Sequence, residues 1–346
     1  MPTYDCNDLS RRQVVSGLMA SPLILSTPAR AQLSATQYEF GVASIDPIYS
    51  SIYVAFKKGF FKDAGLNIEY LNSQSGPRTK QMLAAGQVLL GSSGVNDALA
   101  TTIAGKATTV VFGLDRRITY ANLLIRKEDA GKFKSIADLS GQRVAVTQPQ
   151  SATWLMAVFM TEKGGAKDVD IRGLGDFATM LGALKSKQVA ATVATSAMLD
   201  QVKQDDWAVP LFSIGDDASW NATFGGDVPG IGVYVLQEQI EKNPEAVQAA
   251  VTALVKGSDL IKSSSPESLT DLLYEDYMSG LPKETVTTGL AFYKKNVFSS
   301  DNIITEESFG RLTGIMKDRQ FTPEQMDKVP YKIAINMDFV RKARAK

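Results

Sequence analysis

Polar residues recur where an apolar, strand-like run of this sequence changes into a helical pattern. The clusters are Ser44/Asp46/Tyr49, Ser75/Gly76/Arg78, Ser92/Ser93/Asn96/Asp97, Gln150/Ser151/Thr153/Trp154 and Thr195/Ser196. The first turn of a helix leaves backbone N–H groups unpaired and carries the positive end of the helix dipole. Together with hydroxyl side chains, such helix starts can bind an anionic group. Each serine is also a good helix N-cap, so every position has an ordinary structural explanation as well.

Charged and aromatic side chains could complete such a site. Arg116 and Arg117 follow a strand that ends at Leu114, and a guanidinium can pair with a carboxylate or sulfonate through two hydrogen bonds. Either arginine could instead be solvated or form a salt bridge between two halves of the chain. Trp154 and Trp220 could stack on a ligand ring or belong to the core. We select as ligand-binding candidates all the clustered residues except Asp97 and Gln150, together with Arg116, Arg117 and Trp220.

Composition limits the chemistry that these residues could perform. The 346 residues include 37 Lys+Arg, 37 Asp+Glu, no His and one Cys. The absence of His excludes Ser-His-Asp and Cys-His catalysis and His-ligated metals. Zero formal net charge argues against nucleic-acid binding, and a single Cys excludes disulfides within the chain. Carboxylate, Lys or Tyr chemistry, or no chemistry at all, remains open, and we favour binding without catalysis, with no cofactor and no metal. The helix starts described above predict that the ligand is a small anion.

The first 31 residues are typical of an export signal. Arg11 and Arg12 precede a short apolar run from Val14 to Leu25, and Ala29-Arg30-Ala31 fits a small-x-small cleavage site. The adjacent arginines favour the twin-arginine route. The alternatives are an amphipathic first helix and a membrane anchor, but the run is too short to span hydrocarbon. We predict a periplasmic protein that acts as a monomer, with Cys6 removed together with the signal.

Strand and helix patterns alternate after the signal, and the alternation appears twice. The predicted strands are Tyr38–Ser44, Leu66–Leu71, Val88–Gly91, Thr108–Leu114, Arg143–Thr147, Val169–Arg172, Val189–Thr195 and Val228–Val235. The interval Gly65 to Gln87 is matched by Gly165 to Gln188, which suggests two similar α/β lobes. Beyond the last strand the chain becomes helical, starting at Asn243-Pro244-Glu245, where we expect Asn243 to cap the helix.

The sequence also resembles a known family. The run Val54 to Ile68, VAFKKGFFKDAGLNI, together with Met82-Leu83-Ala84-Ala85-Gly86 and Leu139 to Val146, is similar to the periplasmic solute-binding proteins of ABC importers of the nitrate/sulfonate/taurine type. The resemblance implies an α/β fold of two lobes with a ligand cleft between them, closing like a hinged clamp. Lobe I would comprise 38–115 and 225–346, with the C-terminal helices packed on it, and lobe II would comprise 120–222. A membrane permease would be the partner.

Three functions remain open at this point. The first is a non-enzymatic binding protein that delivers a small anion to an importer. We prefer a sulfonate or carboxylate, including aromatic ones, because Tyr49, Tyr120, Trp154 and Trp220 lie near the predicted cleft. The second is an enzyme on the same fold, related to thiamine-pyrimidine or menaquinone biosynthesis. The third is a periplasmic sensor subunit that presents its ligand to a receptor.

Overall fold

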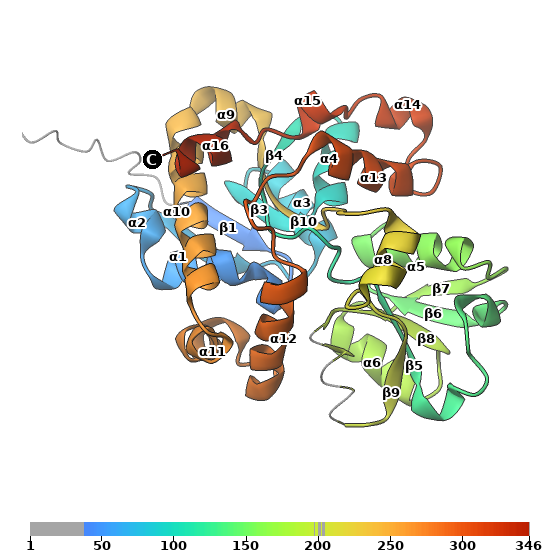
Figure 1. The fold of residues 1–346 in the computed structure, drawn as a ribbon. Helices are drawn as coiled ribbons and strands as arrows, with labels where there is room; N and C mark the ends of the chain where they lie inside the picture. Colours follow the sequence, from blue (N-terminus) through green and yellow to red (C-terminus); the bar gives the residue numbers. More distant parts are fainter. Residues whose placement is uncertain (1–37, 197, 200–201, 203–204, 346) are drawn as a thin grey trace, which may run out of the picture. The chain divides into compact units, whose positions relative to one another are not determined.

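Each described strand belongs to one of two five-stranded mixed sheets in a computed structural model (Figure 1). The structure describes residues 38–196, 198–199, 202 and 205–345, and these belong to one compact unit. The predicted export signal, with its twin arginines and Cys6, lies outside the described residues. We call the first sheet and its helices lobe I, and the second sheet and its helices lobe II.

The sheet of lobe I has the order β2-β1-β3-β10-β4. Its strands are β1 (Tyr38–Val42), β2 (Ile68–Asn72), β3 (Leu90–Gly94), β4 (Thr108–Gly113) and β10 (Ile231–Leu236). Strands β1, β2 and β3 are parallel, with Tyr38 opposite Ile68 and Phe40 opposite Leu90, whereas β10 is antiparallel to both β3 and β4. Every residue of β3 and β4 is buried, so this part of the sheet is covered on both faces.

The sheet of lobe II repeats that order as β7-β6-β8-β5-β9. Its strands are β5 (Asn122–Arg126), β6 (Arg143–Val146), β7 (Asp170–Gly173), β8 (Ala191–Ala194) and β9 (Ala208–Phe212). In both lobes the antiparallel strand is the one that has just crossed from the other lobe, β5 in lobe II and β10 in lobe I. Both crossing strands also carry a register shift against an edge strand, β9 or β4. The predicted similarity of the two halves is therefore visible in their topology.

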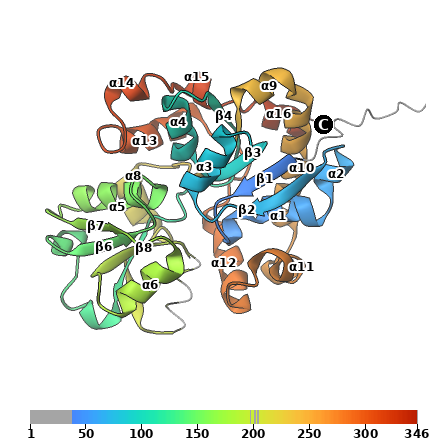
Figure 2. The same ribbon diagram turned by 180° about the vertical axis from the view of Figure 1, so that it is seen from behind.

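Helices cover both sheets (Figures 1 and 2). Lobe I holds η1 (Pro47–Tyr49), α1 (Ser50–Lys57), α2 (Phe60–Asp63), α3 (Gly76–Ala84) and α4 (Val95–Ile103). Lobe II holds η2 (Lys127–Asp129), η3 (Ile136–Leu139), α5 (Ala152–Lys163), α6 (Phe177–Lys185) and α8 (Asp217–Phe224). The C-terminal helices are α9 (Gln237–Lys242), α10 (Pro244–Ser263), α11 (Pro266–Leu273), the π-helical turn η4 (Tyr274–Met278), α12 (Lys283–Asn296), α13 (Glu306–Met316), α14 (Pro323–Met326), α15 (Tyr331–Ala334) and α16 (Asp338–Arg344).

The C-terminal helices return to lobe I, as the sequence predicts. Helix α10 packs along α1 and α16, and its residues Val247, Val251 and Leu254 are almost completely buried. The helix begins at Pro244 as expected, but the predicted cap by Asn243 is wrong. The Asn243 side chain donates to Gln239 Oε1 in the preceding helix (3.1 Å) instead of capping α10.

The two lobes are joined by a hinge of neighbouring connecting segments. Residues 114–121 lead into lobe II, and residues 225–230 lead back. Asp115 Oδ1 accepts hydrogen bonds from the N–H groups of Gly230 (2.7 Å) and Ile231 (3.0 Å), which ties the two crossings together. The segment after α12 joins them, because Ser299 N donates to Leu114 O (3.0 Å) and Arg116 N donates to Val297 O (2.9 Å).

Strands β5 and β9 are absent from the sequence prediction. Strand β5 follows the hinge directly and is buried from Asn122 to Ile125, so it shows no alternation of polar and apolar residues. Strand β9 contains Pro210, which argues against a strand assignment in a sequence reading. Proline is tolerated here because β9 lies at the edge of its sheet and pairs only with β5.

Candidate functional site

A cavity of about 350 Å³ lies between the two lobes at the ends of their strands. Its walls come from the loops and helix starts that follow β1, β2 and β3 in lobe I, from the hinge, and from the starts of α5 and α6 in lobe II. We call this cavity the cleft. It is lined by Ala43, Ser44, Ile45, Tyr49, Asn72, Gln74, Ser75, Gly76, Pro77, Ser93, Gly94, Asp97, Tyr120, Thr147, Ser151, Ala152, Thr153, Gly175, Asp176, Phe177, Ala178 and Ile231.

The lobe II wall contains three hydroxyl groups that bond to one another. Thr147 Oγ1 lies 3.0 Å from Ser151 Oγ and 2.7 Å from Thr153 Oγ1, and the last two are 2.9 Å apart. Ser151 caps α5 by accepting from Trp154 N (3.2 Å). The N–H groups of Ala152 and Thr153 belong to the first turn, which has no intrahelical acceptors. This wall therefore offers hydroxyls, backbone donors and the positive end of a twelve-residue helix.

The lobe I wall contains a buried carboxyl group. Asp97 is 1% exposed, and its Oδ2 accepts from Ser93 Oγ (2.8 Å), which also lies 2.6 Å from Tyr234 Oη. Burial raises the pKa of Asp97, while the ammonium of Lys80, 3.6 Å from Oδ1, acts in the opposite direction. Gly76 makes this arrangement possible, because a Cβ at that position would lie 2.1 Å from Asp97 Oδ2.

Seven of the predicted site residues line the cleft, from both lobes. They are Ser44, Tyr49, Ser75, Gly76, Ser93, Ser151 and Thr153. These residues come together because the carboxyl ends of parallel strands share one edge of a sheet. Whether each contacts a ligand stays a prediction.

Ten predicted residues do not line the cleft, and the three arginines are among them. The Arg78 guanidinium is exposed and donates to Gln74 Oε1 (2.8 Å). Arg116 forms an exposed ion pair with Asp227 (3.6 Å). Arg117 is 5% exposed, pairs with Asp217 (2.5 Å) and donates to Ile214 O (3.0 Å). Both arginines therefore form salt bridges, but neither bridge joins the two lobes, because Asp227 lies in the hinge and Asp217 begins α8 of lobe II.

The two tryptophans also lie outside the cleft lining. Trp220 is completely buried, stacks on Phe224 with ring centroids 4.1 Å apart, and donates to Gly226 O (2.9 Å). Its role is therefore in the core of lobe II, where Arg117 lies 5.5 Å from its ring centre. Trp154 is half-buried and packs against the hydrophobic core.

The remaining five residues hold the structure around the cleft. Ser92 donates to Gly232 O (3.1 Å), Asn96 to Gln320 Oε1 (3.4 Å), and Ser196 Oγ accepts from Asn122 (3.4 Å). Asp46 caps η1 through Ile48 N (2.8 Å), and burial raises its pKa to about 6. The fifth residue, Thr195, directly follows β8, and its Oγ1 accepts from Met198 N (3.3 Å).

The site residues selected from the sequence do not include any residue at the start of α6. Asp176 caps this helix by accepting from Thr179 N (2.8 Å), and that bond lowers its pKa. Gly175, Phe177 and Ala178 line the cleft beside it. The internal repeat would have identified the start of α6 as part of the site. Ser75 follows Gly65 by ten positions, and Asp176 follows Gly165 by eleven, so α6 is the counterpart of α3.

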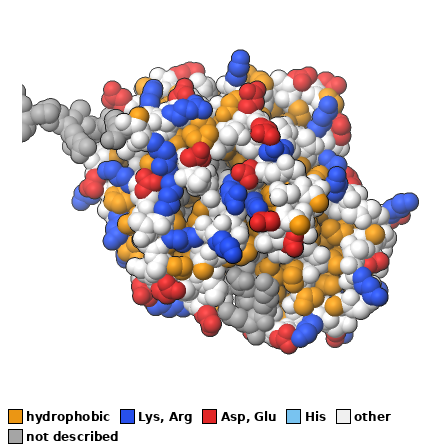
Figure 3. Space-filling view, viewed as in Figure 1, with side chains coloured by type: hydrophobic (Ala, Val, Ile, Leu, Met, Phe, Trp, Pro, Cys, Tyr) orange, Lys and Arg blue, Asp and Glu red, His pale blue; other side chains and the backbone are white. Residues whose placement is uncertain are grey.

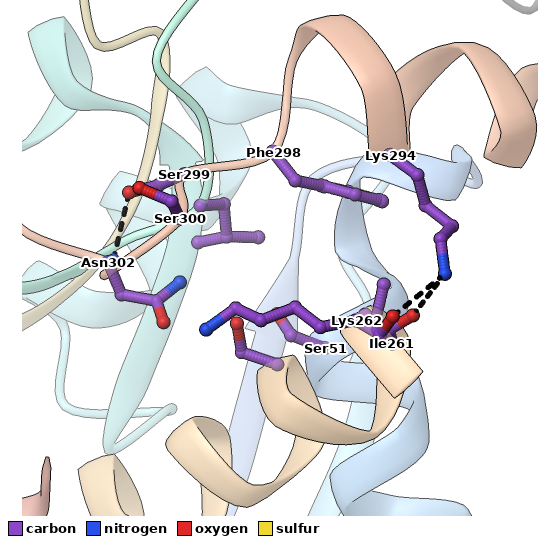
Figure 4. Close-up of a pocket in the computed structure, with 10 residues that line it drawn as sticks. Ser51, Ile261, Lys262, Lys294, Phe298, Ser299, Ser300 and Asn302 are labelled. Atoms are coloured by element: carbon purple, nitrogen blue, oxygen red, sulfur yellow. Dashed lines mark hydrogen bonds between the residues drawn. The ribbon is translucent and has the colours of Figure 1, made fainter. Parts of the chain in front are cut away.

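A second cavity of about 220 Å³ lies beside the hinge (Figure 4). Leu114, Ile261 and Phe298 supply its apolar walls. Figure 4 shows Lys294 at the end of α10, where its ammonium donates to Ile261 O (2.6 Å). The same ammonium donates to Ser264 O. This lysine therefore supplies a further donor to the last turn of α10, where Ile261 O also accepts from Ser264 N (3.4 Å).

Acidic and basic side chains both occur over the face of the molecule seen in Figure 3, as expected from their equal numbers. Among the described residues, no helix is long and apolar enough to cross a membrane, and no group of three acidic, His or Cys side chains could hold a metal ion.

Comparisons with known proteins agree with this architecture. The family model described as NMT1/THI5 like matches residues 46–267. "Putative binding protein YtlA" of Bacillus subtilis is 22% identical over 301 residues, which cover 85% of this chain and 86% of that protein. A solved structure from Bordetella bronchiseptica has a TM-score of 0.78 at 23% identity, covering 89% of this chain and 97% of the other.

A second solved structure is the alkanesulfonate-binding protein SsuA from Xanthomonas axonopodis bound to MOPS. Its TM-score is 0.65 at 19% identity, and the match covers 89% of this chain and 97% of that one. Likeness at this level shows the fold, which is the predicted two-lobed α/β fold with a cleft. The chain thus belongs to the NMT1/THI5-like family and has the fold of periplasmic solute-binding proteins of the nitrate/sulfonate type.

Proposed function

We propose that this protein is the extracytoplasmic solute-binding component of an ABC importer. It captures a small solute in the cleft by hinged closure of the lobes and delivers it to a membrane permease. The observation that carries the proposal is the cleft itself, walled by helix starts from two lobes that a three-segment hinge connects. The relatives named as binding proteins support it.

The solute carries an anionic group, a carboxylate or sulfonate, that binds at the start of α5. The hydroxyl groups of Thr147, Ser151 and Thr153 and the free N–H groups of the first turn support this assignment. Within the described chain no arginine lines the cleft, so the predicted guanidinium clamp is not part of the proposal. The solute's body lies against Tyr49, Tyr120 and Phe177, which suits an organic ligand, including an aromatic one.

The protein works without catalysis, as a monomer in the periplasm, after export by the twin-arginine route. The described lining residues of the cleft provide no nucleophile paired with a general base of the His type, because the chain has no His. An enzyme of the same fold would turn over its ligand, whereas a sensor subunit would bind it without affecting uptake.

Two measurements test the proposal. The first is thermal denaturation with a panel of carboxylates and sulfonates, where a ligand at a hundred times its Kd should stabilise the protein by about 2.7 kcal/mol. The second is uptake of the bound compound by cells with and without the gene. Loss of uptake on deletion is expected. Chemical conversion of the ligand by purified protein would favour the enzyme, and unchanged uptake would favour the sensor.

A further inference from the structure

The cavity beside the hinge, which we call the hinge cavity, differs in charge from the cleft. Two lysines line it, Lys262 from α10 and Lys294 from α12, and no carboxyl group is among its described lining residues. The cleft has the opposite character, since Asp97 and Asp176 line it and no described Lys or Arg does. Of the two cavities, the hinge cavity is therefore the better suited electrostatically to an anionic group.

Lys294 has no carboxylate partner in the described chain. Its ammonium donates only to backbone carbonyls, those of Ile261 (2.6 Å), Lys262 (3.3 Å) and Ser264. Burial lowers the pKa of Lys294, and no described carboxylate acts against that effect. The charge of this ammonium is therefore left for a bound anion to neutralise.

Lys262 shares its carboxylate partner with another cation. Its ammonium lies 2.9 Å from Asp259 Oδ1, and Arg344 Nη1 lies 3.1 Å from the same oxygen. The side chains of Lys262 and Asp259 are about half exposed, so water weakens their pair. Figure 4 shows the Lys262 side chain extending from α10 in the direction of Asn302. Positive charge is thus in excess along this wall of the hinge cavity.

Two buried hydroxyl groups of the hinge cavity have open hydrogen-bond positions. Ser51 of α1 and Ser258 of α10 are 5% and 6% exposed, and neither hydroxyl has a partner in the described chain. By contrast, Ser299 Oγ donates to Asp301 Oδ1 (3.3 Å) and accepts from Asn302 N (2.9 Å). Buried hydroxyl groups are normally hydrogen-bonded, so the two free ones call for a partner inside the cavity.

The hinge cavity has room for a small organic molecule. Its volume is about 220 Å³. An apolar cavity of about 150 Å³ holds a molecule of the size of benzene. Leu114, Ile261 and Phe298 supply apolar wall, whereas the ammonium groups and free hydroxyls supply polar contacts. This combination suits a carboxylate that carries a short apolar chain.

A molecule in the hinge cavity would contact two segments of the hinge. Leu114 begins the segment that enters lobe II, and Phe298 and Ser299 belong to the segment after α12. These segments are joined, because Ser299 N donates to Leu114 O (3.0 Å) and Asp115 forms an antiparallel bridge with Phe298. The opposite walls come from α1, α10 and α12 of lobe I. The cavity thus lies between the helices of lobe I and the hinge.

We propose that the hinge cavity is a second ligand site, for a small organic carboxylate, and that its occupant restrains the hinge. The carboxylate group binds the Lys262 ammonium and the hydroxyls of Ser51 and Ser258, and the apolar chain packs on the three apolar wall residues. An occupant that fits the hinge as it stands in this structure favours this arrangement of the lobes over others. The site is separate from the cleft and does not depend on the proposed function.

Methyl NMR separates the two cavities in one titration of the full chain. Ile261 lines the hinge cavity, whereas Ile45 and Ile231 line the cleft, so labelled isoleucine methyl groups distinguish binding at the two places. Hexanoate should shift the Ile261 signal saturably, with a Kd of about 1 mM or below, as expected for a ligand of this size. Hexanamide has the same size but no charge, and should bind at least about fivefold more weakly. No saturable shift of the Ile261 signal, or equal affinity for the amide, overturns the proposal.

Variants assign this binding to the hinge cavity. Lys262→Met removes the charge and keeps an unbranched side chain, and should weaken binding of hexanoate at Ile261 by about fivefold or more. The matched control is Lys332→Met, which removes an exposed lysine of α15 and should leave the affinity unchanged. Ser258→Leu fills the cavity and should abolish the Ile261 shift. Unchanged affinity in Lys262→Met protein overturns the assignment, whether or not Ser258→Leu folds.

Distances between the lobes test the restraint on the hinge. Spin labels at Lys58→Cys and Gln188→Cys, in a Cys6→Ser background, lie in lobes I and II. Hexanoate should narrow the distance distribution, and Ser258→Leu should remove this effect. If Ser258→Leu does not fold, Lys262→Met takes its place at a concentration that saturates only the parent protein. An unchanged distribution in the saturated parent protein, or narrowing that persists in the variant, overturns the restraint.

Discussion

Arg319 of lobe I forms an ion pair with Glu162 of lobe II, with Nε 2.5 Å from Oε2. The same guanidinium lies 5.3 Å from the ring centre of Phe159 in α5. Beside it, Gln320 Nε2 donates to Gln150 O (2.7 Å), one residue before the α5 cap, and its Oε1 accepts from Asn96 in α4 (3.4 Å). The α13–α14 connection therefore contacts both ends of α5 in lobe II and the start of α4 in lobe I (Figures 1 and 2).

Loss of the ion pair between Arg319 and Glu162 should favour an open arrangement of the two lobes. Arg319→Ala should lengthen or broaden the distance between spin labels placed at Lys58→Cys in lobe I and Gln188→Cys in lobe II. Because Cys6 is the only cysteine, a Cys6→Ser background makes the labelling specific. Ligand affinity should fall by no more than about fivefold, since partly exposed ion pairs contribute up to about 1 kcal/mol.

The matched control is Lys127→Ala, which breaks an exposed ion pair with Asp206 (2.7 Å) inside lobe II. It should leave the label distance unchanged. If Arg319→Ala also leaves the distance distribution unchanged, the connection does not hold the lobes together.

Gly76→Ala should damage both stability and binding. The new Cβ would lie 2.1 Å from Asp97 Oδ2, so α3 or the carboxyl group must move, at a cost of about 1–3 kcal/mol in the free energy of unfolding. Gly182→Ala is the control, because that glycine lies within α6 and a Cβ there would meet no described atom within 4 Å beyond its own helix backbone. It should be neutral or stabilise by about 0.5–1 kcal/mol. Similar melting curves for the two variants would contradict the role of Gly76.

Arg117 should matter for folding rather than for ligand contact. Arg117→Ala removes the donor to Ile214 O and the contact with the Trp220 ring, and should cost about 1–3 kcal/mol of stability. Arg116→Ala removes only an exposed pair and should change stability by less than about 1 kcal/mol. Urea unfolding measures both. A large loss of ligand affinity in folded Arg117→Ala protein would restore the guanidinium clamp that the sequence suggests.

Asp46 should make stability depend on pH between about 4 and 6. Burial raises its pKa from 3.8 to about 6, so over this range the folded state binds more protons than the unfolded state. Stability therefore falls as the pH rises through this window, by up to roughly 3 kcal/mol for a shift of about two units.

Asp46→Asn keeps the cap on η1 but cannot ionise. The difference between the wild-type and variant free energies of unfolding should thus grow from pH 4 to pH 6 and then level off. Burial also raises the pKa of Asp115, to about 8. The contribution of Asp115 to the pH dependence of unfolding is the same in both proteins, so it cancels in this difference. Parallel pH profiles for the two proteins would rule out the titration of Asp46 in this range.

Much of this architecture follows from local patterns in the sequence. The alternation of strands and helices and the repeat of Gly65–Gln87 in Gly165–Gln188 depend on hydrophobic periodicity. The helix start at Pro244 depends on the preference of proline for the first turn of a helix. The positions of the seven selected residues that line the cleft also follow from the sequence pattern, because the end of a parallel strand determines which edge of the sheet the next residues occupy.

Which of the predicted site residues contact the cleft and which contact the core depends on how segments that are distant in the sequence meet in the fold. The hinge segment before β5 brings Arg117 against Ile214 and Trp220, which turns two ligand candidates, Arg117 and Trp220, into a structural pair. The hinge brings the starts of α3 and α6 to one cavity, which makes Asp176 a lining residue. The sequence alone determined two similar lobes with polar helix starts. Only the tertiary structure decided which of these helix starts line the cleft. It also decided that the described lining contains carboxyl groups and no arginine. Neither could be predicted, because contacts across the hinge have no local signature in the sequence.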